Sequence, residues 1–231
     1  MRLGVHGVPG ACALVVAAAG ALVAATLAAA GATPVAPAAG AVVSSRPTLA
    51  WTLPDNEVTD AVFVATSPEL TAAGDFGNDA IVDAGVFDAD VRRWTPSDAL
   101  YAGRYWWLVA SHDVASLTYF RTAPRPFVVR AEVAFRRVSA RTYPRTGITQ
   151  VVATWRSNAR DVTLRARIVR GLRTLATRRF AEQGVAGFDG TTAFTWKRPR
   201  SLRPGTPLRL VLTLAGGGAS RTTTVPFRAP R

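Results

Sequence analysis

One stretch decides the fold of the first half of this chain: Leu100-Tyr101-Ala102-Gly103-Arg104-Tyr105-Trp106-Trp107-Leu108-Val109. Its large side chains at every second position, Tyr105, Trp107 and Val109, would share one face of a β-strand and enter a core. Gly103 permits a tight entry into that strand, and Leu100 would anchor the loop before it. The stretch therefore predicts a half-buried strand that follows a turn.

The chain carries the same landmarks twice, about one hundred residues apart. Trp51 recurs as Trp155, 104 positions later. Trp94 and the Leu-x-x-Gly of residues 100–103 recur as Trp196 and the Leu-x-x-Gly of residues 202–205, an offset of 102. Phe127 near the end of the first copy recurs as Phe227, an offset of 100. Three landmarks at nearly equal spacing indicate an internal duplication.

Apolar residues repeat with a period of two within each copy. Val162–Ile168 alternates strictly between apolar and polar residues, and Leu208–Leu214 places a leucine at every second position. This is the pattern of half-buried strands. We expect further strands at 61–66, 104–110, 148–155 and 222–227. Short strands in units of about 100 residues predict an all-β chain with two tandem immunoglobulin-like β-sandwiches.

The first unit resembles a bacterial fibronectin type III domain over residues 34–130. The resemblance rests on Leu49-Ala50-Trp51-Thr52-Leu53-Pro54 and on the Leu-x-x-Gly-x-Tyr-x-Trp-x-Val pattern of residues 100–109. The second unit resembles an immunoglobulin-like or type III-like fold more loosely, because Leu208 stands where the tyrosine would be. The resemblance implies a binding or spacing module. We divide the chain into a signal segment (1–32), a spacer (33–40), a first sandwich (41–130) and a basic second sandwich (131–231).

Residues 1–32 predict an export signal. Arg2 precedes an apolar run, residues 11–30, that contains only Ala, Val, Leu, Gly, Cys and Thr. Ala30-Gly31-Ala32 offers a processing motif that predicts a mature N-terminus at Thr33, and Ala28-Ala29-Ala30 is a second candidate. An uncleaved membrane anchor is the alternative, since about 20 apolar residues span a bilayer. We therefore expect a secreted or cell-surface protein whose only membrane contact would be through an uncleaved N-terminal segment.

The positive charge is concentrated in the second half. Residues 33–130 carry a net charge of −4 and residues 131–231 carry +16; with Arg2 in the first segment, these sum to the net charge of +13. The strand alternation places Arg165 and Arg167 outward on one strand, and Arg209 and Arg228 outward on two others. If these strands share a sheet, the four arginines form one candidate binding face. Its partner would be an anionic cell-envelope polymer, an acidic lipid or the first module, with nucleic acid disfavoured by compartment; a merely solvated basic face is the alternative.

Trp106 is the candidate exposed aromatic residue. It lies out of phase with Tyr105 and Trp107, so it would point outward together with Leu108. A sugar-stacking platform or a protein-binding patch could use such side chains. We favour burial under the neighbouring module.

The sequence lacks the usual machinery of catalysis. His112, in Ser111-His112-Asp113, is the one histidine after the signal segment, and adjacent residues in a strand point to opposite faces. The one cysteine, Cys12, lies within the signal segment, which disfavours a cysteine-ligated zinc site. Oxygen ligands for calcium could come from a group of side chains that lacks calcium-loop spacing: Asp75, Asn78, Asp79, Asp83, Asp88 and Asp90. We predict no enzymatic activity, no metal and no cofactor.

These observations lead to a prediction of function by class. We expect an exported, non-enzymatic binding or spacer protein that acts at or outside the cell surface, with an unknown protein or an anionic envelope polymer as its partner. One alternative is a polyanion-binding protein that acts through the second module. The other is an accessory module of an extracellular hydrolase.

Overall fold

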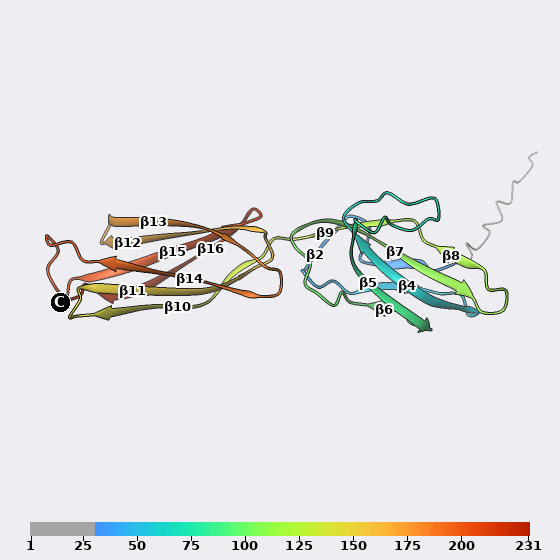
Figure 1. Cartoon of the computed structure of the whole chain (residues 1–231), viewed down its shortest axis with the longest axis horizontal. Helices are drawn as coiled ribbons and strands as arrows, with labels where there is room; N and C mark the ends of the chain where they lie inside the picture. Colours follow the sequence, from blue (N-terminus) through green and yellow to red (C-terminus); the bar gives the residue numbers. More distant parts are fainter. Residues whose placement is uncertain (1–30) are drawn as a thin grey trace, which may run out of the picture.

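The computed structural model describes residues 31–231, and the regular structure within that range consists of β-strands alone. Two elongated sandwiches lie end to end (Figure 1). The predicted all-β class is therefore confirmed. The predicted signal segment lies outside the described residues, except for Gly31 and Ala32. In the described part of the chain, no helix is long and apolar enough to span a membrane.

The first module packs a three-stranded sheet against a larger one. The small sheet has the order β1-β3-β6. The larger sheet has the order β2-β9-β7-β4-β5, and β8 pairs with the far end of β7. Their bounds are β1 (Thr33–Ala36), β2 (Ala41–Val43), β3 (Leu49–Thr52), β4 (Glu57–Ala65), β5 (Ile81–Ala89), β6 (Arg93–Trp94), β7 (Gly103–Asp113), β8 (Tyr119–Arg121) and β9 (Arg125–Val129).

The second module repeats this plan with longer strands. A three-stranded sheet of order β10-β11-β14 faces a four-stranded sheet of order β13-β12-β15-β16. Their bounds are β10 (Val133–Tyr143), β11 (Ile148–Ser157), β12 (Asp161–Arg170), β13 (Arg173–Gln183), β14 (Asp189–Lys197), β15 (Pro207–Gly216) and β16 (Ala219–Arg228). The pairs are antiparallel, as expected for strands joined by short turns.

The two modules share one strand order. In the small sheets β1, β3 and β6 correspond to β10, β11 and β14, and in the large sheets β5, β4, β7 and β9 correspond to β13, β12, β15 and β16. Trp51 and Trp155 lie on corresponding strands, as do Trp94 and Trp196. Tyr105 pairs with Phe127, and Leu208 pairs with Phe227 at the corresponding place. The duplication predicted from the landmarks is thus present in the fold.

The prediction of a spacer at residues 33–40 is wrong in its first half. Thr33–Ala36 form β1, which pairs with β3 inside the first sandwich. The run of Thr, Pro, Val and Ala indicated an extended chain, but not that this extended chain joins a sheet. The first module therefore begins before residue 41.

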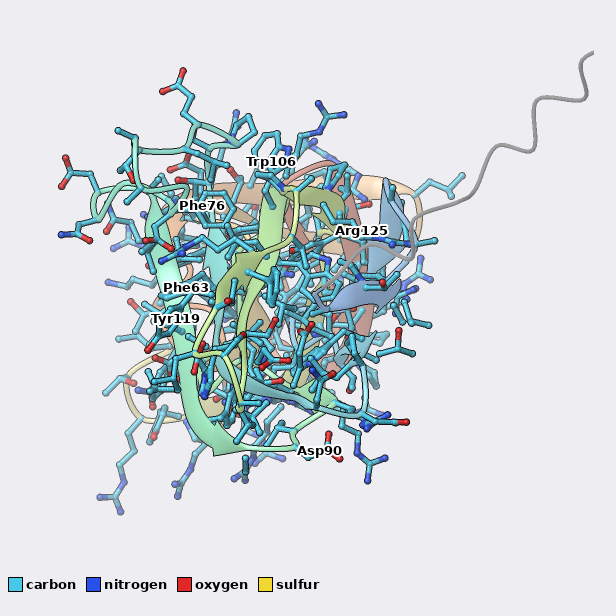
Figure 2. The ribbon with its side chains drawn as sticks, turned by 90° about the vertical axis from the view of Figure 1, so that its right-hand side faces the viewer. Phe63, Phe76, Asp90, Trp106, Tyr119 and Arg125 are labelled. Carbon is cyan, nitrogen blue, oxygen red and sulfur yellow. The ribbon has the colours of Figure 1, made fainter. Side chains whose placement is uncertain are left out.

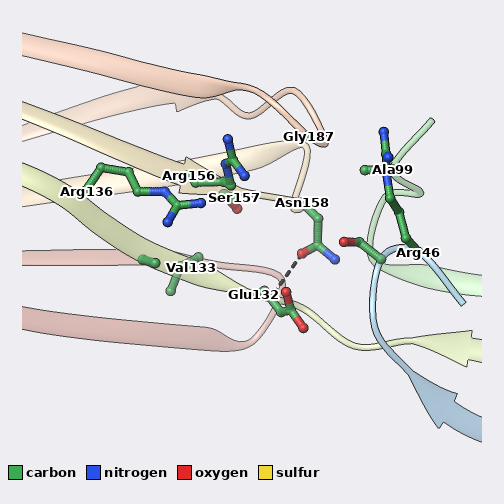
Figure 3. Close-up of a pocket in the computed structure, with 11 residues that line it drawn as sticks. Arg46, Ala99, Glu132, Val133, Arg136, Arg156, Ser157, Asn158 and Gly187 are labelled. Carbon is green, nitrogen blue, oxygen red and sulfur yellow. Dashed lines mark hydrogen bonds between the residues drawn. The ribbon is translucent and has the colours of Figure 1, made fainter. Parts of the chain in front are cut away.

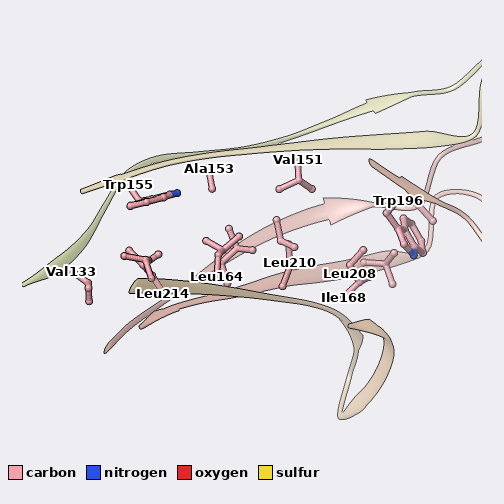
Figure 4. Packing of buried hydrophobic residues seen from close by; sticks show 14 of the residues in the cluster. Val133, Val151, Ala153, Trp155, Leu164, Ile168, Trp196, Leu208, Leu210 and Leu214 are labelled. Atoms are coloured by element: carbon pink, nitrogen blue, oxygen red, sulfur yellow. The ribbon is translucent and has the colours of Figure 1, made fainter. Parts of the chain in front are cut away.

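Each module has its own apolar core. In the first module Trp51 and Trp107 are both buried, with ring centroids 6.4 Å apart. In the second, the indole of Trp155 lies between the two sheets above leucines of β12 and β15 (Figure 4). The indole nitrogens of the equivalent residues Trp51 and Trp155 both have hydrogen-bond partners. Trp51 donates to the hydroxyl of Thr59 (2.9 Å), and Trp155 donates to the hydroxyl of Thr192 (3.0 Å). The predicted burial of both tryptophans is confirmed, and hydrogen bonding makes that burial tolerable for their polar N–H groups.

The predicted turn before β7 is held by a tyrosine. The hydroxyl of Tyr105 donates to the carbonyl of Tyr101, four residues upstream, at 3.0 Å. Leu100 is buried as the predicted loop anchor. A buried tyrosine that fastens its own loop in this way is a recurrent device of immunoglobulin-like sandwiches. In the second module Leu208 fills the corresponding place without a hydroxyl.

Candidate functional site

The four-stranded sheet of the second module presents arginines on its outer side. Leu164, Ala166 and Ile168 of β12 are buried, so Arg165 and Arg167 point away from the core. On β15 the same alternation turns Arg209 outward. These strands are direct neighbours, with Arg165 opposite Thr213 and Val169 opposite Arg209. Three of the four arginines singled out in the sequence therefore lie on adjacent rows of one sheet.

Arg228 belongs to the same sheet but lies at its end. It pairs with Pro207 at the start of β15, and its guanidinium donates to the carbonyl of Gly205 (3.2 Å). Arg209 also has one backbone partner, the carbonyl of Gly171 (3.0 Å). Each of these contacts leaves other N–H groups of a five-donor guanidinium unassigned. Arg209 stays within the group, whereas Arg228 is peripheral to it.

Sequence reasoning missed a fourth central arginine, Arg179. It lies on β13 directly opposite Arg165. No strand was predicted there, because Arg173–Gln183 contains few apolar residues and alternates weakly. The outer side of this sheet that carries Arg165, Arg167, Arg179 and Arg209 is called the arginine face below. Like charges that pair directly across strands disfavour the sheet unless a counter-charge meets them.

The acids of the second module do not neutralise the arginine face. Asp189 pairs with Arg156 (2.8 Å) and Arg136 (3.6 Å), and both lie on the other sheet. Within residues 31–231, no ion pair involves any of the four arginines of the face. The first module meets the second end to end, so it does not cover this side either (Figure 1). Asp161, at the start of β12 and in phase with Arg165, forms no ion pair with the face either, so its arginines are not ion-paired in the part of the chain that the structure describes.

A shallow hollow of about 590 Å³ lies on the arginine face. Two arginines, three threonines and one alanine line it: Arg165, Arg179, Thr163, Thr177, Thr213 and Ala215. Planar guanidinium groups bind phosphate or carboxylate in pairs of hydrogen bonds, and hydroxyl groups can donate to the same oxygens. The hollow is open and carries two positively charged guanidinium groups, so its chemistry suits an extended anion.

Trp106 is not the exposed aromatic platform that the sequence suggested. The strand phase is right, since Trp106 and Leu108 point away from the main core, but Leu108 is 0% exposed and Trp106 is only partly exposed. Phe76 packs beside them, from the loop that joins β4 to β5 (Figure 2). Asp75 holds that loop through a 2.6 Å ion pair with Arg121 of β8. The expected burial under the neighbouring module is also wrong, because the module's own loop covers this side.

Ser111, His112 and Asp113 point in different directions, as predicted for neighbours in a strand. The Ser111 hydroxyl donates inward to Glu57 (2.9 Å), whereas Nδ1 of His112 lies 2.6 Å from Asp60 on the outside. Asp113 accepts from the backbone N–H groups of Ala115 and Ser116, and the N–H of Ser116 is the main reason that the pKa of Asp113 is lowered. They do not form a triad. Among the residues described, no three His, Cys, Asp or Glu side chains gather in a way that could hold a metal.

The two modules meet at a junction built around Asn158, which is only 4% exposed. Its side-chain oxygen accepts from the N–H of Glu132 (2.7 Å), and its amide group donates to the carbonyl of Arg130 (2.8 Å). Its own carbonyl accepts from the N–H of Ala102 in the first module (2.8 Å). Arg160 adds a cation–π contact, 4.2 Å from the ring centroid of Tyr101. The connecting residues 130–132 are thereby fixed to both modules.

A cleft of about 520 Å³ opens beside this junction (Figure 3). Arg46 and Ala99 border it from the first module, and Arg136, Arg156 and Asn158 border it from the second. Its arginines are partly neutralised, since Arg136 and Arg156 share Asp189. The arginine face therefore offers the stronger anion-binding chemistry.

The strand order decides the fold type. In each module a three-stranded sheet faces a larger sheet that contains four corresponding strands in the same order, β5-β4-β7-β9 in the first and β13-β12-β15-β16 in the second. The first module also has the tyrosine that fastens the turn before β7. Both modules have a fibronectin type III-like fold. The resemblance of residues 34–130 to this domain type is confirmed at the level of the fold. The second, immunoglobulin-like module shares the same strand order.

Comparisons with known proteins find similar solved structures but no related sequence. No family model matches the chain, and no curated protein matches it. Among solved structures, the chain is similar to the chicken CNTN1 FN1–FN3 domains (15% identity, 87% of this chain and 67% of that one, TM-score 0.31). It is also similar to the chicken interferon gamma receptor alpha chain (11% identity, 86% of this chain and 98% of that one, TM-score 0.38). A third similar structure is that of the Clostridium thermocellum CbhA fibronectin(III)-like modules (12% identity, 87% of this chain and 94% of that one, TM-score 0.28).

Proposed function

We propose that this chain is an exported, non-enzymatic protein that binds an anionic polymer of the cell envelope through the arginine face. The observation that carries the proposal is the absence of any ion pair to Arg165, Arg167, Arg179 and Arg209 within the described residues. Aligned arginines disfavour the free protein and favour a bound polyanion, because the ligand removes their mutual repulsion. A phosphate- or carboxylate-bearing polymer at the cell surface has the matching chemistry.

The tandem architecture supports a spacing role beside the binding role. The Asn158 junction holds the modules end to end. Because the arginine face belongs to the second module, the first module separates it from the N-terminal segment. Two fibronectin type III-like modules in series are suited to hold one surface at a fixed distance from another. The fold alone does not establish this role. The arrangement of the arginines supports an anionic polymer as the ligand.

Binding of the full chain to polyphosphate tests the proposal. We expect affinity to fall steeply as salt rises, as for other polycation–polyanion contacts. Replacing Arg165, Arg167 and Arg209 by serine together should weaken binding and reduce the slope of log affinity against log salt by about 2–3. The matched control replaces Arg136, Arg141 and Arg200, which lie outside the arginine face. Equal losses in both triple variants would show diffuse charge attraction and overturn the assignment of this face.

A further inference from the structure

A carboxylate is buried where the first residues of the structure enter the first module. Glu57, at the start of β4, is 5% exposed. Both of its oxygens have partners: Oε2 accepts from the Ser111 hydroxyl at 2.9 Å, and Oε1 accepts from the backbone nitrogen of Gly31 at 2.8 Å. Ser111 is itself buried. This carboxylate is thus held in a fixed position inside the module.

Glu57 has no cationic partner among residues 31–231. None of the ion pairs in that range involves it. Two hydrogen bonds from neutral groups do not supply the positive charge that usually accompanies a buried carboxylate. The partner that occupies Oε1 is a backbone nitrogen, and such a nitrogen becomes cationic if the chain begins there.

Gly31 fits its place closely. It is buried, its φ is +109°, and a Cβ atom added to it would lie 3.0 Å from the Cβ atom of Phe120. A left-handed φ favours glycine, and the close ring leaves little room for a side chain. The next residue, Ala32, packs against the core of the first module. Residues 31 and 32 therefore pack as part of the folded module.

We infer that the chain is cleaved between Ala30 and Gly31, and that the new N-terminal ammonium of Gly31 forms a buried ion pair with Glu57. A signal peptidase would hydrolyse the Ala30–Gly31 peptide bond during export, before the module folds. Water adds across the bond, so that Ala30 leaves with a carboxylate and Gly31 gains an amino group, protonated at neutral pH. Ala28-Ala29-Ala30 provides the small residues that such a peptidase recognises at alternate positions.

The other processing motif, Ala30-Gly31-Ala32, would place the N-terminus at Thr33. That cut would remove Gly31 from Glu57 and Ala32 from the core, and would leave Oε1 of a buried carboxylate without its donor. Loss of one partner from a buried charge is among the most destabilising changes a protein can suffer. The geometry at Glu57 therefore favours the cut two residues earlier. This inference rests on the export step of the proposed function and is independent of the arginine face.

The exported protein tests the cut directly. The full chain would be expressed in a bacterium that exports it, and the mature form examined by intact mass and N-terminal sequencing. We expect Gly31 as the first residue. A start at Thr33, or a persistent Met1 start, would overturn the inference, while polyphosphate binding would still be measurable on the same material.

Chemical labelling tests the buried ammonium. A chain that begins at Gly31 has two primary amines, the α-amine and the exposed Lys197, which is the one lysine in the sequence. In the folded protein an amine-reactive ester should label Lys197 freely and the Gly31 amine about 100-fold more slowly, since reaction requires local opening. The matched control keeps Ala30 as an extra first residue, and its amine should react as fast as it does in the denatured chain. Equal labelling of both amines in the Gly31 form would refute the buried pair.

A change of charge at Glu57 completes the test. Glu57→Gln should lower the unfolding midpoint of the first module by about 10 °C in the chain that begins at Gly31, because the ammonium loses its counter-charge. In the chain that keeps Ala30, the same substitution should have a small or stabilising effect, because it removes an unpaired buried charge. Equal shifts in both chains would show that Glu57 acts only as a hydrogen-bond acceptor and would overturn the ion pair.

Discussion

The indole of Trp155 lies directly over Gly190, its register partner on the neighbouring strand β14. A Cβ atom added to Gly190 would clash with Cζ2 of this indole. The ring occupies the space that a side chain at position 190 would take. Its N–H donates to the hydroxyl of Thr192, two residues further along β14. The glycine on β14 and the tryptophan on β11 therefore form one packing unit.

Gly190→Ala should destabilise the second module by about 3 kcal/mol, because the indole cannot move without leaving its place between the sheets. Urea unfolding monitored by tryptophan fluorescence measures the change. The same substitution should cost much less in a Trp155→Leu background, where the smaller side chain frees the space. Gly77→Ala is the control, since a Cβ atom there meets nothing within 4 Å. A neutral Gly190→Ala would mean that the indole does not lie over the glycine.

Trp51→Ala and Trp155→Ala should each cost about 3–5 kcal/mol, because both indoles are buried and hydrogen-bonded. That loss approaches the whole stability of a small domain, so each variant should unfold its own module and largely spare the other. Two separate transitions in calorimetry would show this. A loss below about 1 kcal/mol at either position would contradict the observed burial.

Asn158→Ala should loosen the junction between the modules. The substitution removes the side-chain NH2 group that donates to the Arg130 carbonyl and the side-chain oxygen that accepts from the Glu132 N–H. The two backbone groups left without partners should cost about 1–3 kcal/mol. Small-angle scattering should show a broader distribution of end-to-end lengths, with both modules still folded by circular dichroism. Asn78→Ala, in an exposed loop, is the control and should leave the distribution unchanged. An unaltered distribution for Asn158→Ala would show that the junction does not depend on this side chain.

Burial raises the pKa of the Tyr105 phenol above its ordinary value of 10.0. The folded state therefore favours the neutral phenol, and its contribution to stability is complete below pH 10. That contribution is lost as the pH rises from the unfolded pKa towards the higher folded pKa. Tyr105→Phe should flatten the decline of first-module stability above pH 10. Equal slopes in the wild type and Tyr105→Phe would contradict the assignment.

The strands with strict alternation could be predicted from the sequence, whereas those with weak alternation could not. Val162–Ile168 was found because four apolar residues mark one face, but β13 and β14 carry too few apolar residues to show a period of two. Arg165, Arg167 and Arg209 were therefore placed on one face, and Arg179 was missed. The phase of Leu108 was right, but periodicity shows only to which side a residue points. It does not show that the loop with Phe76 lies on that side.

The series arrangement of the modules has a mechanical consequence. Gly31 enters beside Phe120 near β8, at the end of the first module away from the junction, and the C-terminus lies at the far end of the second (Figure 1). Tension applied between the two ends must then pass through residues 130–132, where a few hydrogen bonds to Asn158 resist it in place of a continuous strand ladder. We expect force–extension records to begin with a short, low-force lengthening at this hinge, ahead of either sandwich, and Asn158→Ala to abolish that first step. A chain of this design yields at its joint first and keeps its binding surface folded under load.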